Sequence, residues 1–478
     1  MRLHTKKTGK EDLIILPVTE GFDKKRFSKK MQNYLDKHEH FIGRQDTQLL
    51  LQGKQDNLFL GIGKQASQDA IRKAAGTAAK YARDHHHKHY GVDLRTTGDQ
   101  AQAAAEGTLL GLYRYHEYKK RKAGEPQDPT HCTIITDDHK IAGKQVKRGK
   151  VIAEGVILVR DLVNTPASEK YPAKIANLAK ELGKRHGFSV AVLGKKELEK
   201  LGMESMLSVS RGSDKEPQLV LLELNNDKQE APVALAGKGV TFDAGGLQVK
   251  PDPYMREMKL DMGGAATVLG TMTALARLKH PGRIIGALGL VENMLGPDAY
   301  KPGDILKAYN DKTIEVEHTD AEGRLVLADV LSYLEKQYKP THLIDLATLT
   351  GSAIYALGYR VTPLLGNDKE LIEGIKLAAE QTDELVWELP LYKHYEKMVE
   401  GAISDVRNLG KKPSGMGAPG TIIAAAFLKN FVTDKVAWAH LDIAGTAFSY
   451  EKTAYVPEGG TGWGVRLLTE LFTQSLER

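Results

Sequence analysis

Three glycine-rich segments contain most of the residues whose types and spacing could do chemistry. They cover residues 237–251, 258–264 and 319–324. The side chains that could act there are Lys238, Asp243, Lys250, Asp261, Asp320, Glu322 and Arg324. Carboxylates brought together repel one another and resist ionisation, so a hard divalent cation is their natural partner. The segments hold enough oxygens for two such ions.

Asp320 and Glu322 are two residues apart, and this spacing predicts that they share a face. In an extended segment, residues i and i+2 point the same way, so both carboxylates would leave one side of the chain. Arg324 would continue that face. Such a geometry suits shared cations.

Salt bridges offer a simpler explanation of the same residues. Lys238, Lys250 and Arg324 could serve only as partners of the acids. A surface charge cluster would not, however, require the glycine pairs Gly245-Gly246 and Gly263-Gly264, which let a backbone or a ligand approach closely. We therefore favour a ligand site and keep the salt-bridge alternative open.

Other common chemistries lack their motifs. The chain has no Gly-x-Ser-x-Gly elbow, no His-Glu-x-x-His and no Gly-x-x-x-x-Gly-Lys-[Ser/Thr] phosphate loop. Its single cysteine, Cys132, excludes an intramolecular disulfide and a cysteine-based zinc site, and we expect it in the core. The histidine-rich segment 85–89 follows a predicted helix and is interpreted as its exposed end. We expect adventitious metal affinity there at most, because consecutive side chains do not converge on one ion.

Alternating strands and helices beyond about residue 165 are expected to position the acidic segments. Strands separated by helices predict a largely parallel sheet covered on both faces, with ligands bound beyond the carboxyl ends of the strands. Chemistry is therefore expected in the loops after Leu235, Leu290 and Ala347. The predicted strands are 188–193, 219–224, 233–235, 284–290 and 342–347, and the predicted helices are 172–186 and 265–278.

The first third has an α/β alternation of its own. Strands are predicted over 13–16, 58–60 and 133–136, and helices over 69–83 and 100–115. A basic stretch, 140–150, precedes an amphipathic run over 151–163, so we place the domain boundary between residues 150 and 165. The predicted fold class is α/β with two domains. Residues 1–155 form the smaller one, and residues 156–478 form the larger one around a mostly parallel central sheet flanked by helices.

The formal charge of +6 is unevenly distributed along the chain. Residues 1–150 sum to about +11 and residues 151–478 to about −5. A basic domain could bind nucleic acid, although a solvated lysine-rich surface explains the same charge and no nucleic-acid-binding motif accompanies it.

Length and composition exclude several classes of protein. The chain has 478 residues, of which 41% are hydrophobic, so a disordered chain is excluded. No apolar run approaches the roughly 18 residues that span a bilayer, so no membrane partner is expected. Residues 1–12 are polar and the apolar stretch 13–16 is too short for a secretory signal, so we expect a cytoplasmic protein.

The acidic segments resemble those of the cytosolic leucyl aminopeptidases, a family of two-metal peptidases. The family hallmark Asn-Thr-Asp-Ala-Glu-Gly-Arg-Leu stands here as His-Thr-Asp-Ala-Glu-Gly-Arg-Leu over 318–325. The segments 160–166, 345–351 and 438–447 also fit the family pattern. The resemblance runs in order from residue 160 to 450, whereas the first 150 residues match only in length and α/β character.

The resemblance implies a role for each residue of the acidic segments. Two divalent ions, Zn or Mn with Mg and Co as further candidates, would be held by a lysine and four acids. Lys250 would polarise the carbonyl of the bond that is cleaved, and Arg324 would hold a bicarbonate that acts as general base. The implied metal ligands are Lys238, Asp243, Asp261, Asp320 and Glu322, with Asp243 and Glu322 bridging the ions and Asp320 also lending its backbone carbonyl.

The resemblance also implies substrates and an assembly. Peptides would be shortened by one N-terminal residue of the Leu or Met type, and the family forms hexamers. Two positions depart from the family: His318 replaces the usual Asn and Ala244 the usual Ser. We expect His318 to be a turn residue beside the ligands. The residues that would line the side-chain pocket are Met258, Thr348, Leu349 and Gly351.

Overall fold

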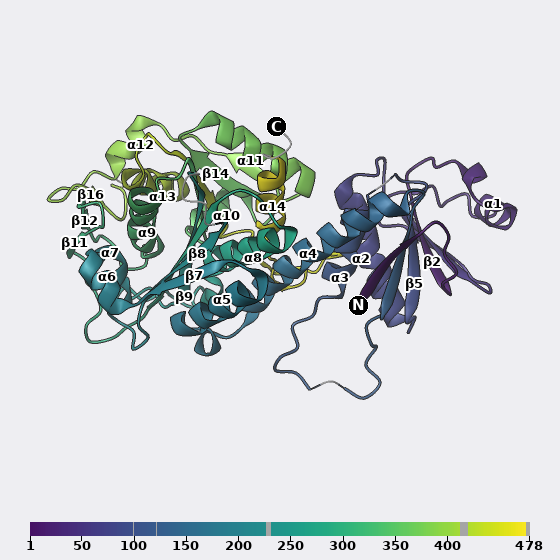
Figure 1. Cartoon of the computed structure of the whole chain (residues 1–478), viewed down its shortest axis with the longest axis horizontal. Coiled ribbons are helices and arrows are strands. Elements are labelled where there is room, and N and C mark those ends of the chain that lie inside the picture. The colour runs from purple at the N-terminus through teal and green to yellow at the C-terminus, as the bar shows by residue number, and fades with distance from the viewer. Residues whose placement is uncertain (99, 121, 226–230, 412–418, 475–478) are drawn as a thin grey trace. The chain divides into compact units, whose positions relative to one another are not determined.

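The computed structural model describes the chain except for residues 99, 121, 226–230, 412–418 and 475–478. Its contacts divide the chain into two compact units. The first unit comprises residues 1–157 and 450–458, and the second unit comprises residues 158–449 and 459–478. Both units are α/β, so the predicted fold class is confirmed. In Figure 1 the first unit is mostly purple and blue, and the second runs from blue-green to yellow.

The second unit is built on an eight-stranded sheet. Its four central strands, β17, β13, β9 and β10, are parallel to one another, as the sequence predicts. Towards the edges the sheet is mixed, because β14 is antiparallel to β17, β8 to β10 and β7 to β8. The order across the sheet is β15 (Val386–Glu388), β14 (Thr362–Gly366), β17 (Ala437–Asp442), β13 (His342–Ala347), β9 (Val233–Asp243), β10 (Ile284–Asn293), β8 (Gln218–Leu224) and β7 (Ser189–Leu193).

Helices cover both faces of this sheet (Figure 1). One face carries α5 (Pro172–His186), α8 (Gly263–Leu278), α11 (Lys369–Thr382) and α14 (Val465–Gln474). The other carries α7 (Glu204–Ser210), α9 (Gly323–Tyr338) and α13 (Gly420–Leu428). The shorter helices are α6 (Lys195–Leu201), α10 (Gly351–Leu357) and α12 (Lys393–Met398), and the small strands are β11 (Ile305–Lys307), β12 (Thr313–Glu315), β16 (Val406–Arg407), β18 (Phe448–Ser449) and β19 (Gly459–Gly460).

Strand β9 is longer than the sequence predicts. The expected strand ends at Leu235, but β9 continues to Asp243, so Lys238 and Asp243 lie on the strand itself and not in a loop after it. The glycines that interrupt the apolar pattern allow close packing: a side chain at Gly237 would collide with the backbone of Ala265 in α8. Glycine in this strand thus marks a close approach of two elements.

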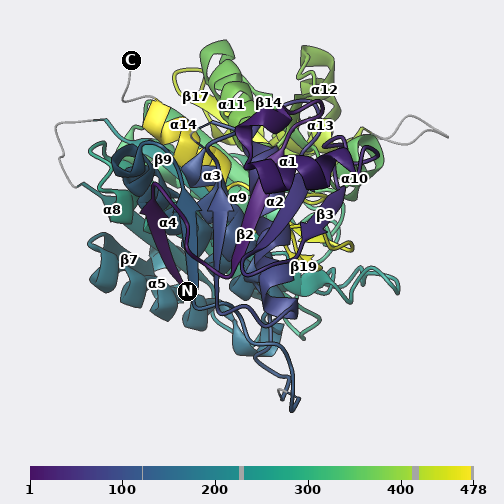
Figure 2. The same cartoon turned by 90° about the vertical axis from the view of Figure 1, so that its right-hand side faces the viewer.

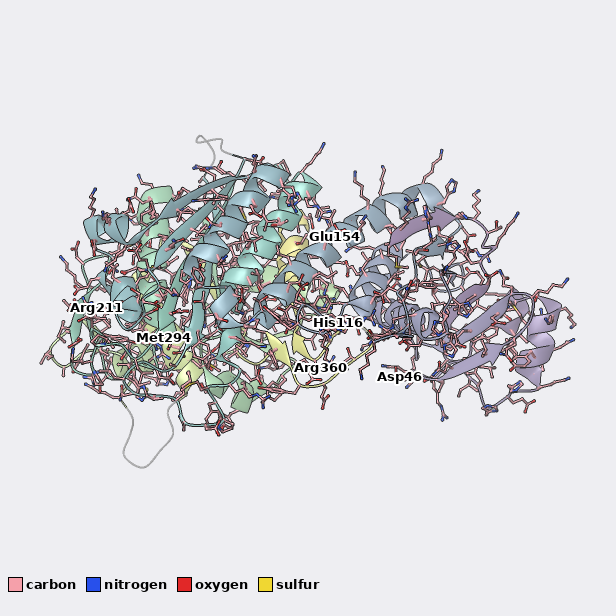
Figure 3. The ribbon with its side chains drawn as sticks, turned by 90° about the horizontal axis from the view of Figure 1, so that it is seen from below. Asp46, His116, Glu154, Arg211, Met294 and Arg360 are labelled. Atoms are coloured by element: carbon pink, nitrogen blue, oxygen red, sulfur yellow. The ribbon has the colours of Figure 1, made fainter. Side chains whose placement is uncertain are left out.

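Close packing also joins loops of the second unit. The Cα of Gly212, just after α7, faces the carbonyl oxygen of Met294, just after β10. Figure 3 labels Met294 and Arg211, the neighbour of Gly212, in this unit.

The first unit is built on a six-stranded sheet with helices on both faces (Figure 2). Alanine-rich faces of α2 and α3 pack on one side, while α1 and a group of phenylalanines cover the other. The strands, in order across the sheet, are β1 (Arg2–Lys6), β6 (His131–Ile135), β5 (His89–Asp93), β2 (Leu13–Val18), β4 (Asp56–Gly61) and β3 (Gln48–Leu51), and the helices are α1 (Lys29–Asp36), α2 (Gln68–Asp84) and α3 (Ala101–Leu112).

The basic stretch 140–150 is helical and continuous with the amphipathic run that follows it. Both belong to α4 (His139–Asn164), which begins where the Asp138 carboxylate accepts hydrogen bonds from the backbone N–H groups of Lys140 and Ile141. The division between the units, after Ile157, falls inside α4.

The first unit also contains a segment from near the end of the chain, Tyr450–Glu458. The Tyr455 hydroxyl donates a hydrogen bond to Asp69 Oδ1 at 2.6 Å, and Arg72 lies over the Tyr455 ring. Lys80 donates to the Thr453 carbonyl oxygen at 2.6 Å. The first unit is therefore completed by residues nearly 300 positions beyond its main part.

The single cysteine and the apolar helices bear on two expectations from composition. Cys132 is fully buried, as predicted, and burial raises the pKa of its thiol to about 12. Among the described helices, none has both the length and the apolar character needed to cross a bilayer.

Candidate metal centre

The ends of the four central strands bring the site together. Asp243 is the last residue of β9, Asn293 of β10 and Asp442 of β17, while Thr348 directly follows β13. Because these strands are parallel, their carboxyl ends meet at one edge of the sheet. The candidate site lies at this edge, beyond the ends of β10 and β13, where the sequence predicts chemistry.

Three carboxylates converge at the first part of the site. Oxygen atoms of Asp243, Asp320 and Glu322 all lie within 4.8 Å of one another. The Lys250 ammonium lies beside them, with Nζ 2.8 Å from Asp243 Oδ2 and 2.5 Å from Asp320 Oδ1. We call these three acids the carboxylate cluster.

Lys238 forms a second cluster that shares Glu322 with the first. Its Nζ lies 2.8 Å from Asp261 Oδ1 and 2.9 Å from Glu322 Oε1, and it donates a hydrogen bond to the Thr348 carbonyl oxygen at 2.8 Å. All of these side chains are buried. We call Lys238, Asp261 and Glu322 the lysine cluster. Two clusters joined through one carboxylate have a suitable arrangement for a pair of cations.

Burial and mutual repulsion oppose ionisation of most of these acids. Burial, followed by repulsion from Glu322, raises the pKa of Asp243 to about 7, and the same causes raise the pKa of Asp320. Burial raises the pKa of Asp261 well above its ordinary value. Burial also opposes ionisation of Glu322, but the neighbouring lysine charges outweigh it and lower that pKa. A divalent cation would relieve the repulsion, so the residues fit a hard metal ion.

Salt bridges explain only part of this arrangement. Burial disfavours the charge of Lys238 and Lys250, yet the surrounding carboxylates raise the pKa of both ammonium groups. Among the residues that the structure describes, the ion pairs leave Asp261 Oδ2 and Arg324 Nε buried without hydrogen-bond partners. Buried polar atoms without partners cost free energy unless a ligand satisfies them. These two atoms therefore favour a ligand site over a purely structural charge cluster.

Arg324 is buried near the two clusters but belongs to neither of them. Its terminal nitrogen donates a hydrogen bond to the Asn408 carbonyl oxygen at 2.9 Å. Burial lowers the pKa of its guanidinium to about 10, so the group remains charged at neutral pH. A buried cation with an unused donor is suited to bind an anion.

The segment 318–324 is a turn that leads into α9, which corrects the expected extended segment. Glu322 has helical backbone angles and directly precedes α9, and Arg324 lies in its first turn. The Ala321 N–H donates to the His318 carbonyl oxygen at 3.2 Å. The carboxylates of Asp320 and Glu322 therefore converge through a turn and not through strand alternation.

His318 holds this turn with its imidazole. Its Nδ1 accepts a hydrogen bond from the backbone N–H of Asp320 at 3.1 Å. An asparagine side chain makes the same type of bond to the N–H two residues further on. The departure at 318 is thus accommodated in the turn. Ala244, the other departure, is buried directly after Asp243.

Sequence reasoning missed the polar residues that orient these acids. Asn293 donates to Asp243 Oδ1 at 2.8 Å and to the Thr319 carbonyl oxygen at 3.0 Å. Asn408 accepts from the N–H groups of Glu317 and His318 and donates to the carbonyl oxygen of His318. The place of Asn293 in the loop expected just beyond a predicted strand was a usable signal, whereas Asn408 had none.

The residues expected to line a side-chain pocket lie on two segments. Met258 is half-buried in a short 3-10 helix, Met258–Leu260, just before Asp261. Thr348 is buried, and its hydroxyl donates to Asp261 Oδ1 at 2.7 Å. Leu349 is half-buried against the core, and Gly351 is exposed at the start of α10. The structure thus places Thr348 directly beside the lysine cluster.

Comparison with known proteins identifies both parts of the chain. Residues 157–469 match the catalytic domain of the cytosol aminopeptidase family, and residues 29–122 match the N-terminal domain of the same family. A probable cytosol aminopeptidase of Syntrophotalea carbinolica is 41% identical over 430 residues, which cover 87% of this chain and 85% of that protein.

Solved structures agree with this match. The bottromycin maturation enzyme BotP in complex with Mn has 34% identity and a TM-score of 0.87, covering 98% of this chain and 100% of BotP. A mutant of tomato leucine aminopeptidase has 30% identity and a TM-score of 0.87, covering 99% of this chain and 96% of the tomato protein. The chain, a peptidase of the hydrolase class, belongs to the cytosol aminopeptidase family.

Proposed function

We propose that this metal-dependent aminopeptidase removes single N-terminal residues, preferably Leu and similar residues, from peptides. The observation that carries the proposal is the convergence of the carboxylate and lysine clusters at one edge of the sheet, with Lys250 and Arg324 beside them. We assign the chemistry to residues 156–478 and regard residues 1–155 as the variable domain.

Five residues would hold two divalent ions. We assign Asp243, Asp320 and Glu322 to one ion and Lys238, Asp261 and Glu322 to the other, with Asp243 also bridging. When bound, the ions supply a more acidic water molecule and a contact for the free amine of the peptide. A lysine ligand must be neutral, which a neighbouring cation favours by lowering its pKa. Zn and Mn are the first candidates, with Mg and Co also compatible with such ligands.

Lys250 would remain charged and act on the substrate. Its surrounding carboxylates raise its pKa, so the ammonium is present at neutral pH. A fixed positive charge at this position would polarise the carbonyl of the bond to be cleaved and stabilise the negative charge that develops on its oxygen.

Arg324 would bind bicarbonate, whose role is to accept a proton. The unused Nε and the planar guanidinium suit a small planar anion. Arg324 itself would then only hold this base in place.

The side-chain preference would depend on Met258 and on the turn 348–351. An apolar lining discriminates by only about 1–3 kcal/mol per methylene group, so we expect broad specificity for Leu, Met and similar residues. The amine contact would limit cleavage to one residue at a time.

The metal requirement and two substitutions test this proposal. Chelated protein should be inactive on Leu-p-nitroanilide and recover with Mn or Zn. Lys250→Ala should lower kcat by about 10²–10³-fold because a charge next to the developing oxyanion is lost. Glu322→Ala should abolish metal-dependent activity because both clusters lose a ligand.

The control is Lys301→Ala, which removes an exposed lysine outside both clusters. It should retain wild-type activity. A wild-type protein that releases no amino acid under any metal, or a Lys250→Ala variant as active as the wild type, would contradict the proposal.

We also propose a homohexamer in the cytoplasm, in keeping with the family. Light scattering should give six times the mass of the chain, and a monomeric mass would count against it. The basic first unit supports DNA binding as a second candidate function. A salt-titrated gel shift without any complex at low ionic strength would dispose of that candidate.

A further inference from the structure

The turn after β13 contacts two members of the lysine cluster. The Thr348 carbonyl oxygen accepts a hydrogen bond from Lys238 Nζ at 2.8 Å, and the Thr348 hydroxyl donates to Asp261 Oδ1 at 2.7 Å. Thr348 thus contacts Lys238 and Asp261, the two members of the lysine cluster that do not belong to the carboxylate cluster. Its position therefore affects that cluster more than the other.

Asp442 holds this turn from the end of the neighbouring strand. Its Oδ1 accepts hydrogen bonds from the backbone N–H groups of Leu349 at 3.0 Å and Thr350 at 3.4 Å. Its Oδ2 accepts from the Thr350 hydroxyl at 2.6 Å. Asp442 is fully buried, so these bonds are shielded from water. A charged acceptor of this kind fixes backbone N–H groups more strongly than a neutral one.

A second contact anchors the same turn from α13. The Thr350 hydroxyl lies 2.7 Å from the Thr421 hydroxyl, which in turn lies 3.1 Å from the Ser352 hydroxyl. The turn is thus held on both sides, by β17 through Asp442 and by α13 through Thr421. This bracing leaves the Thr348 carbonyl little freedom to reorient.

The direction of that carbonyl matters for Lys238. An amine that binds a metal ion has one lone pair and two N–H bonds, so a hydrogen bond to a fixed acceptor limits where the lone pair can point. Asp261 is limited in the same way, because the Thr348 hydroxyl donates to Oδ1, while Oδ2 has no hydrogen-bond partner within the described part of the chain. Groups around metal ligands orient them in this manner in many sites.

We propose that Asp442 is a positioning residue for the metal centre. Through the Thr348–Thr350 turn it aligns Lys238 and Asp261 for the ion of the lysine cluster, and it has no such effect on the ion of the carboxylate cluster. This inference rests on the proposed two-metal function and adds a specific residue and a specific ion to it.

The test is the number of Mn ions bound per chain, measured on the full-length protein by equilibrium dialysis. Wild-type protein should bind two. Asp442→Ala should bind about one at a free Mn concentration that just saturates the wild type, because loss of such an orienting group costs about 10–100-fold in metal affinity. Selective loss of one ion would not follow from general destabilisation.

Thr350 variants keep the test decisive if Asp442→Ala does not fold. Thr350→Val removes the hydroxyl that donates to Asp442 Oδ2 and contacts Thr421, and it should also lower the number of bound ions to about one. Thr350→Ser keeps the hydroxyl and should restore two.

Asp345→Asn is the matched control. Asp345 lies on β13, opposite His440 of β17, and is as fully buried as Asp442. It accepts hydrogen bonds from Trp438 and His440 but not from the 348–350 turn. This variant should lower the thermal unfolding temperature of the metal-free protein and still bind two Mn ions.

The outcomes separate this inference from the proposed function. If the wild type binds fewer than two ions, the two-metal function fails and the role of Asp442 fails with it. If the wild type binds two and the Asp442 and Thr350→Val variants also bind two with unchanged affinity, only the role of Asp442 is overturned. Loss of an ion in Asp345→Asn would overturn it as well, because destabilisation of the sheet would then explain the effect.

Discussion

His318 makes the hydrogen bond that an asparagine would make at the same position. Its Nδ1 accepts from the Asp320 N–H, and so it shapes the turn on which a proposed metal ligand lies. The side-chain oxygen of asparagine reaches the same N–H in a common turn. The change from the family pattern therefore preserves a contact although it changes the residue.

Substitution at 318 should separate this contact from the imidazole itself. His318→Asn keeps an acceptor for the Asp320 N–H, so kcat/KM on Leu-p-nitroanilide should stay within about two-fold of the wild type. His318→Ala removes the acceptor and should lower kcat/KM by about ten-fold, as is typical when a metal ligand loses its orienting partner. An Ala variant as active as the wild type would show that the turn does not need this bond.

The types of the site residues were predictable, but their partners were not. Asp243, Asp261 and Glu322 could be recognised from acidic residues in glycine-rich segments. Asn408 could not, because an asparagine about 90 residues further along the chain becomes part of the site only when folding brings it to the 317–321 turn. Contacts of this range leave no local pattern in a sequence.

Helix α9, which begins at the site, is joined to α7 and to the loop at Tyr309 through the buried side chain of Asp329. Asp329 accepts hydrogen bonds from the backbone N–H groups of Met206 and Tyr309, both at 2.8 Å, and is completely buried. Burial raises the pKa of Asp329 from 3.8 to about 7. The folded state therefore holds this proton more tightly than the unfolded state does.

The stability of the protein should depend on pH through this residue. The contribution of Asp329 is fully present below about pH 4, falls as the pH rises to about 7 and changes no further above it, because a raised pKa in the folded state favours the protonated form. The free energy of unfolding of chelated protein can be measured with urea at several pH values. Between about pH 4 and pH 7 it should fall less steeply with pH for Asp329→Asn than for the wild type. Equal slopes would contradict the assignment.

The elements themselves were largely predictable, with errors where glycine or charge interrupted a pattern. Strand β13 was predicted with its observed bounds, since the apolar pairs 343–344 and 346–347 flank Asp345 and no glycine breaks the strand. Strand β9 was predicted too short because glycines break its apolar run, and they are needed there for contact with α8. The basic start of α4 was not predicted as helix because its lysines gave it a polar character.

At the scale of the whole molecule, the class and the presence of two units followed from the alternation of strands and helices. The return of the chain to the first unit did not, because 450–458 reads as an ordinary polar loop. Its role depends on Tyr455, which is buried and hydrogen-bonded to Asp69 on α2.

Truncation of Tyr455 should destabilise the first unit. Tyr455→Ala removes a buried ring and its hydrogen bond and should cost about 3–5 kcal/mol, whereas Tyr455→Phe removes only the hydroxyl and should cost about 1.5–3 kcal/mol, because the partner is charged. Urea unfolding of the full chain, followed by limited proteolysis within residues 1–157, measures both. Identical protection of all three proteins would contradict the proposed role of this segment.

The discontinuity of the first unit has a consequence for synthesis on the ribosome. Residues 1–157 are made well before Tyr450–Glu458, so the surface of α2 that receives Tyr455 stays uncovered while the second unit is translated. At about 5–20 residues per second, this interval lasts roughly 15–60 s. During that time the nascent first unit lacks its last segment and is open to chaperones, so its folding is completed only when translation of the chain is almost finished.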